Sequence, residues 1–177
     1  MEYMLMPLKR YADFSGRSRR MEFWMWQLFK FAVVFVVMIL MMVLGGAAIM
    51  GAANGDPGAV LAAGGIVMIL YLLLMLFGLA IIIPDIAVAV RRLHDTDRSG
   101  WWFLAPIAPY VVALLAGGMA MASPDAAGAA GILALLCMLA VLGLAVTLLV
   151  FYFTEGTRGP NRYGPDPKGA APAQAFT

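Results

Sequence analysis

The sequence predicts an all-α membrane protein, a bundle of four transmembrane helices with both termini in the cytoplasm. Composition is the first reason: 63% of the 177 residues are hydrophobic and 12% are charged, whereas soluble domains have about 45–50% apolar and about 25% charged residues. The second reason is four uncharged stretches, each close to or above the roughly 20 residues that cross a bilayer. The third is the distribution of Lys and Arg, which all fall in segments that these spans place on one side.

The predicted spans are apolar on all sides, as helices exposed to lipid are. They cover residues 31–50, 58–83, 101–122 and 128–153. Strands of a membrane barrel alternate apolar and polar residues, and these long continuous runs do not. At this length we expect a single domain, residues 1–167, followed by a flexible tail at 168–177.

The first span has the features of a signal anchor. Nine charged residues precede it, and its apolar run is longer than the roughly 7–15 residues of a cleavable signal core. Its helix can begin nearer Phe23 if the Lys30 amine extends to the headgroups. Ser18 is the predicted N-cap of this helix, since serine accepts hydrogen bonds from first-turn N–H groups.

Short turns separate the spans of each predicted helix pair. Asp56-Pro57-Gly58 and Ser123-Pro124-Asp125 contain the residues that favour tight turns. Pro106 and Pro109 predict a kinked or loosened start of the third span, because proline interrupts helical hydrogen bonding.

The orientation follows from counting basic residues between the spans. Six lie before the first span, three between the second and third, three after the fourth, and none in the other two loops. The positive-inside rule therefore predicts that both termini and the middle loop are cytoplasmic. Three aromatic clusters fall at the same predicted interface: residues 23–26, 101–103 and 151–153.

The predicted spans contain no Asp, Glu, Lys, Arg or His. Ionisable residues inside the membrane usually mark proton relays and coupled transporters, so the sequence disfavours these functions for a single chain. The lone Cys137 cannot form an intrachain disulfide. The formal net charge of +2 is too small for a nucleic-acid-binding surface, and we expect no cofactor.

Three segments beside the membrane carry most of the polar residues. They are the N-terminal segment (14–24), the middle segment (84–102) and the C-terminal segment (155–167). The predicted topology brings all three to the cytoplasmic surface. If the second helix continues past Pro84, Asp85 and Arg92 share a face and form a structural pair, and Arg91 can pair with Asp95 at i,i+4.

We expect these segments to form a platform that binds anionic lipid headgroups or a protein partner. Glycine, proline and asparagine in the C-terminal segment predict successive turns, whose N–H groups can form an anion nest. The candidate binding residues are Arg17, Arg19, Arg20, Arg91, Arg92, His94, Asp95, Arg98, Arg158, Asn161 and Arg162.

Other interpretations of the middle segment remain open. His94, Asp95 and Asp97 are possible metal ligands, but with no second histidine a closed zinc site is not expected. His94 with Asp95 could act as an acid–base pair on a lipid or phosphorylated headgroup, although no nucleophile motif accompanies them. The ordinary interpretation is a salt-bridged loop that fixes two helices. A transporter or channel would require oligomerisation.

Three motifs resemble the DUF805 family of bacterial inner-membrane proteins, a domain of unknown function. They are FSGRSRRMEFW from Phe14, RRLHDTDRSGWW from Arg91 and GTRGPNRYGPDP from Gly156. The resemblance implies a small helical protein of the bacterial inner membrane, without a known activity. Asp97 stands where the resemblance leads us to expect a small or glycine-like residue.

Together these observations favour a non-enzymatic scaffold or accessory protein of the inner membrane. The expected partners are anionic membrane lipids, with a membrane-protein partner or a second copy of the chain as alternatives.

Overall fold

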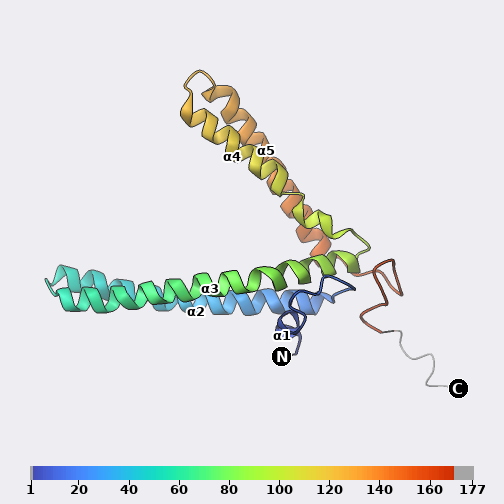
Figure 1. The fold of residues 1–177 in the computed structure, drawn as a ribbon, viewed down its shortest axis with the longest axis horizontal. Coiled ribbons are helices and arrows are strands. Elements are labelled where there is room, and N and C mark those ends of the chain that lie inside the picture. The colour runs from blue at the N-terminus through green and yellow to red at the C-terminus, as the bar shows by residue number, and fades with distance from the viewer. Residues whose placement is uncertain (1, 170–177) are drawn as a thin grey trace. The chain divides into compact units, whose positions relative to one another are not determined.

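The computed structural model describes residues 2–169, which contain six helices and no β-strand (Figure 1). The helices are α1 (Glu2–Lys9), α2 (Arg20–Ala53), α3 (Pro57–Asp95), the short 3₁₀ helix η1 (Gly100–Leu104), α4 (Ile107–Ala122) and α5 (Ala127–Phe153). The chain forms two compact units. The first unit is Met1–Ala12 with Trp24–Asp85, and the second is Asp13–Phe23 with Ile86–Thr177. Most of the tail predicted at 168–177 lies outside the described residues.

Four helices are long and apolar enough to cross a membrane: α2, α3, η1 with α4, and α5. Their most apolar stretches are almost entirely exposed on the single chain, as expected for surfaces that face lipid. The predicted spans are therefore confirmed as candidate membrane helices. α2 and α3 are longer than predicted. The 39 residues of α3 extend about 58 Å at 1.5 Å per residue, well beyond a hydrocarbon core of about 30 Å.

In the first unit, α2 and α3 form an antiparallel hairpin closed by a tight turn (Figure 1). Gly55 has a φ of +68°, and the N–H of Asp56 donates to the carbonyl of Gly51 at 2.9 Å. This is a Schellman motif, in which glycine avoids the steric cost of the left-handed conformation. Asp56 then caps α3, because its Oδ1 accepts the N–H groups of Gly58 and Ala59, as the turn prediction requires.

Pro84 lies inside α3 without ending it. Proline has no N–H, so the carbonyl four residues earlier, at Ala80, loses its helical donor. The hydroxyl of Tyr11 donates to this carbonyl at 2.6 Å. The defect is thereby repaired within the first unit, and α3 continues to Asp95.

Asp85, the next residue, accepts hydrogen bonds from Trp26 Nε1 at 2.9 Å and Lys30 Nζ at 2.5 Å. Both donors are on α2, so the carboxylate joins the two helices of the hairpin. Trp26 is completely buried, so its ring packs inside the protein in addition to donating to Asp85.

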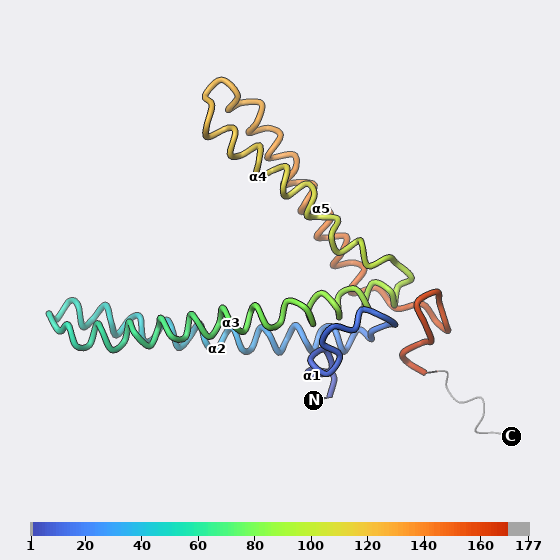
Figure 2. Tube along the Cα trace, in the orientation of Figure 1, coloured from blue at the N-terminus to red at the C-terminus, as the bar shows by residue number. Residues whose placement is uncertain are grey.

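In the second unit, α4 and α5 run antiparallel and side by side (Figure 2). The loosened start of the third span is confirmed: η1 ends at Leu104, and Pro106 immediately precedes α4. Trp102 packs edge-on against Phe151, with 5.5 Å between ring centroids. This aromatic contact fixes η1 to the C-terminal end of α5.

Candidate functional site

The C-terminal end of α3 is surrounded by residues from the other two segments. The N–H of Arg98 donates to the carbonyl of Leu93 at 3.0 Å, and Asp97 N–H donates to His94. These bonds form a second Schellman motif, with Asp97 at the left-handed position (φ +56°). The glycine-like residue that the family resemblance leads us to expect would fit this conformation without strain.

Residues from the N-terminal and C-terminal segments donate hydrogen bonds to carbonyls near the end of α3. Ser18 N–H donates to the carbonyl of Arg91 at 3.1 Å, and Thr157 N–H to that of Asp95 at 2.8 Å. Asn161 Nδ2 donates to the carbonyl of His94 at 2.9 Å. The carbonyls of His94 and Asp95, in the last turn, have no partners within the helix. Their contacts with the C-terminal segment, and the Ser18 bond one turn earlier, hold the three segments together here.

The buried charge network consists of Arg17, Arg91, Arg92, Glu22 and Asp95, all with side chains at most 7% exposed. Asp95 accepts Arg17 Nε at 2.9 Å through Oδ1 and Arg92 Nη1 at 2.5 Å through Oδ2. Glu22 accepts Arg91 Nη2 at 2.9 Å. Removing one partner of a buried ion pair costs about 3–5 kcal/mol, so Asp95, shared by two arginines, is central to this network.

Backbone carbonyls complete the coordination of these arginines. Arg17 donates to the carbonyls of Thr157 at 2.5 Å and Gly159 at 2.6 Å. Arg92 donates to those of Tyr152 and Thr154, at the C-terminal end of α5. The negative end of a helix dipole favours cations, so Arg92 stabilises α5 while it joins α5 to α3.

Two predictions about these arginines are corrected. Arg17, Arg91 and Arg92 were expected on an exposed platform, but their side chains are buried and bind carboxylates and backbone carbonyls of the protein itself. The pairs Asp85–Arg92 and Arg91–Asp95 are replaced by Asp85–Lys30, Arg92–Asp95 and Arg91–Glu22. Seven helical residues span about 10.5 Å, which is too long for a direct Asp85–Arg92 contact.

Gly156 allows the C-terminal segment to lie against the network. A Cβ atom on this residue would overlap the Asp95 carboxylate. A side chain would therefore displace the group that holds Arg17 and Arg92, and this close approach explains why glycine is required here.

His94 and Asp95 diverge. His94 Nδ1 lies 3.2 Å from the carbonyl of Gly16, and its ring stacks on Tyr163 with 3.9 Å between centroids. His94 borders a mainly apolar cavity with Trp101, and Asp95 borders a different cavity. An acid–base pair acting on one headgroup would have to face a common cavity, whereas these two residues line different ones.

Asp97, the third metal-ligand candidate, pairs with Arg162 Nε at 3.0 Å on the surface. Among residues 2–169 no group of three or more His, Cys, Asp and Glu residues is arranged to hold a metal ion. Two more predicted binding residues have internal contacts: Arg98 lies over the Phe151 ring at 3.6 Å, and Asn161 caps α3 as described.

The Ser18 N-cap prediction is wrong. α2 begins at Arg20, and the completely buried Ser18 Oγ has no hydrogen-bond partner among the described residues. The backbone of Ser18 is used instead, for the bond to Arg91. An N-cap must be adjacent to the first helical residue, and Ser18 is one position too early.

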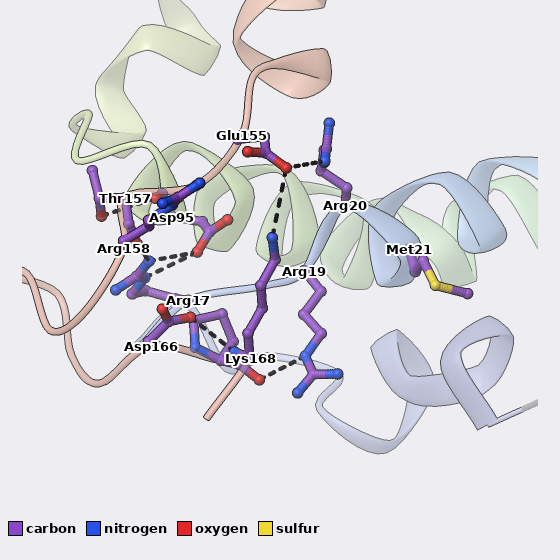
Figure 3. A pocket seen from close by; sticks show the side chains of 12 residues that line it. Arg17, Arg19, Arg20, Met21, Asp95, Glu155, Thr157, Arg158, Asp166 and Lys168 are labelled. Carbon is purple, nitrogen blue, oxygen red and sulfur yellow. Dashed lines mark hydrogen bonds and ion pairs between the residues drawn. The ribbon is translucent and has the colours of Figure 1, made fainter. Parts of the chain in front are cut away.

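The basic cavity, of about 450 Å³, lies beside the buried charge network (Figure 3). Its basic lining residues are Arg17, Arg19, Arg20, Arg158 and Lys168. Its acidic lining residues are Asp95, Glu155 and Asp166. All of them belong to the second unit.

Most of these charges have partners inside the cavity wall. Glu155 accepts Arg20 Nη2 at 2.7 Å and lies 3.7 Å from Lys168 Nζ, and Figure 3 shows both cations reaching toward this carboxylate. Arg19 Nε donates to the carbonyl of Pro167 at 2.6 Å. Arg158 is exposed and has no hydrogen-bond or ion-pair partner among residues 2–169.

Asp166 holds the C-terminal part of the cavity wall in a turn. The backbone N–H groups of Lys168 and Gly159 donate to its carboxylate, and these bonds lower the pKa of Asp166 below its ordinary value. Asp166 is therefore ionised at neutral pH and keeps the loop closed around the cavity.

Sequence reasoning missed seven cavity residues: Met21, Glu155, Gly156, Thr157, Asp166, Pro167 and Lys168. Glu155 and Asp166 are acidic residues of the C-terminal segment, close in sequence to the candidate residues Arg158 and Arg162, so their proximity to these arginines was a usable signal. Lys168 follows the segment and was assigned to the tail. Gly156 gave no signal, because its importance comes from the approach of a distant carboxylate.

Comparison with known proteins agrees with the motifs. Residues 11–165 match the family model described as "Protein of unknown function (DUF805)". The chain is 34% identical to inner membrane protein YhaI of Escherichia coli (strain K12) over 168 residues, covering 95% of this chain and 97% of that protein. It is 30% identical to inner membrane protein YhaH of the same strain, covering 95% and 98%. No solved structure matches the chain.

Proposed function

The chain belongs to the DUF805 family, and from this premise we propose that it is a non-enzymatic scaffold or accessory protein of the bacterial inner membrane that binds anionic lipid headgroups at its cytoplasmic surface. The assembly of three sequence-distant segments around one basic cavity is the observation that carries the proposal.

The division of labour among the arginines supports this function. Arg17, Arg91 and Arg92 are buried. Arg92 joins the ends of α3 and α5, Arg17 binds the C-terminal segment and Arg91 binds Glu22. Exposed cations such as Arg158 and Arg162 project from this fixed support. Lys and Arg near a negatively charged leaflet contribute about 1 kcal/mol each, so even a few such residues give a measurable lipid preference.

The orientation belongs to the same proposal. We place both termini and the middle segment in the cytoplasm, because all 12 Lys and Arg residues lie in segments that four spans put on one side. The cytoplasmic leaflet carries the anionic headgroups that such a surface attracts.

The lipids that the full-length protein retains test the proposal. The protein is extracted in mild detergent and exchanged into mixed micelles with equal amounts of phosphatidylglycerol and phosphatidylcholine, and bound lipids are counted by native mass spectrometry. We expect phosphatidylglycerol to be enriched, and the enrichment to fall with added salt, since salt screens exposed charges. Equal retention of the two lipids at low salt would contradict the proposal.

A further inference from the structure

We propose that the basic cavity is a binding site for a single phosphate group, held by Arg158 together with Arg19, Arg20 and Lys168, and that Glu155 is the counter-ion that this phosphate displaces. The inference rests on the proposed function and deepens it, because it assigns lipid recognition to one cavity and one chemical group instead of the whole basic surface.

The balance of charge is the first reason. Five basic and three acidic side chains line the cavity, which leaves an excess of two positive charges. Asp95 contributes less than a full neutralising charge, because Arg92 behind the wall shares it with Arg17. Glu155 lies close to both Arg20 and Lys168, so one carboxylate faces two cations. A phosphate group would offset much of the remaining positive charge.

Arg158 provides the second reason. Arg158 lines the cavity, and its side chain has no hydrogen-bond or ion-pair partner among the described residues, so its N–H donors are available. Arginine binds phosphate through two parallel hydrogen bonds, which gives both strength and orientation. The cavity volume of about 450 Å³ lies within the range of about 300–1,000 Å³ typical of ligand sites.

The start of α2 provides the third reason. Arg20 and Met21, the first residues of this 34-residue helix, border the cavity. First-turn N–H groups and the helix dipole favour an anion at this end. The Met21 side chain is 59% exposed and gives the cavity an apolar edge, which suits a phosphate attached to a lipid.

The position of Glu155 distinguishes a single phosphate site from a diffuse basic surface. Its side chain is 57% exposed, and so is much of Arg20, at 41%. Exposed ion pairs contribute little, about 0–1 kcal/mol, so a phosphate can replace this carboxylate at low cost. Removing the negative charge of Glu155 should therefore strengthen binding, whereas a diffuse platform would gain much less from one neutralisation.

The experiment compares Arg158→Ala with Arg162→Ala. Both arginines are exposed and lie in the same segment, and both variants remove one positive charge, but only Arg158 borders the cavity. Phosphatidylglycerol and phosphatidylcholine are titrated separately into the detergent-solubilised full-length protein and followed by native mass spectrometry. Glycerol 3-phosphate is added as a competitor, to separate a lipid phosphate from a soluble one.

We expect Arg158→Ala to weaken phosphatidylglycerol binding about fivefold, the equivalent of one basic contact, and Arg162→Ala to weaken it less than about twofold. Glu155→Gln should strengthen binding. If Arg158→Ala does not fold, Lys168→Gln replaces it with the same expectation. Competition by glycerol 3-phosphate at concentrations similar to the lipid would support a phosphate site but assign it to soluble ligands.

Two results would overturn the inference. Equal weakening by Arg158→Ala and Arg162→Ala, with no gain from Glu155→Gln, would show that the surface binds lipid diffusely, and the proposed function would survive without the cavity. Failure of the wild-type protein to bind phosphatidylglycerol would remove both proposals. Equal binding of phosphatidylcholine, which also carries a phosphate, would remove the proposed preference for anionic lipid.

Discussion

At the scale of single residues, the two Schellman motifs have different residues at the position where glycine is preferred. Gly55 and Asp97 occupy the same position of this motif, with φ angles of +68° and +56°. Glycine adopts this conformation freely, whereas a residue with a Cβ atom is strained. Asp97 is partly compensated by its exposed ion pair with Arg162, and such pairs contribute about 0–1 kcal/mol.

We therefore expect Asp97→Gly to be more stable than Asp97→Ala by about 1 kcal/mol. Both variants lose the pair with Arg162, so their difference reports only the backbone strain at residue 97. The measurement is the melting temperature of each purified variant in the same detergent, with the wild-type protein measured alongside as a reference. An Asp97→Ala protein as stable as Asp97→Gly would show that the left-handed conformation is not retained in solution.

The sequence indicated the three segments in which the important charged residues lie, but it could not predict which of these residues pair with one another. The i,i+4 rule proposed Arg91–Asp95, yet Arg91 pairs with Glu22, and Asp95 with Arg17 and Arg92. Arg17 and Glu22 come from a segment distant in sequence, and Arg92 is also held by carbonyls at the end of α5. Such contacts depend on tertiary structure, and local spacing carries no information about them.

At the scale of secondary-structure elements, α3 depends on a repair made by another part of the chain. Pro84 removes the helical donor for the Ala80 carbonyl, and the Tyr11 hydroxyl replaces it at 2.6 Å. The sequence predicted the span and allowed its helix to continue past Pro84. In the structure the helix continues to Asp95. The role of Tyr11 could not be predicted, because a single tyrosine 69 residues away gives no periodic or motif signal.

A double-mutant cycle tests this repair. Tyr11→Phe should destabilise the protein by about 1 kcal/mol, the usual net contribution of one hydrogen bond. In a Pro84→Ala background the new N–H can donate to Ala80, so Tyr11→Phe should then cost much less. Thermal denaturation of the four proteins in one detergent gives the coupling. An equal cost of Tyr11→Phe in both backgrounds would show that the hydroxyl acts independently of Pro84.

At the scale of the whole molecule, hydropathy and charge predicted four spans, and the structure contains four helices that satisfy them. This agreement has a physical cause. A bilayer requires about 20 apolar residues per helix, so each span can be recognised from one continuous stretch of sequence. The cavity could not be predicted in this way. Its wall combines Arg17, residues 19–21, Asp95, residues 155–158 and residues 166–168, and their proximity arises only from folding.

The orientation of these spans remains a prediction, and cysteine labelling tests it directly. Cys137 is the only cysteine, so Cys137→Ser gives a background for single cysteines at four exposed positions. Cysteines replacing Asn54 and Asp125, in the two turns without basic residues, should react with a membrane-impermeant maleimide in intact spheroplasts. Those replacing Lys9 and Arg162 should react only after lysis, because positively charged segments are retained in the cytoplasm. The reverse pattern would place the basic cavity in the periplasm and would contradict the cytoplasmic orientation that the proposed function includes.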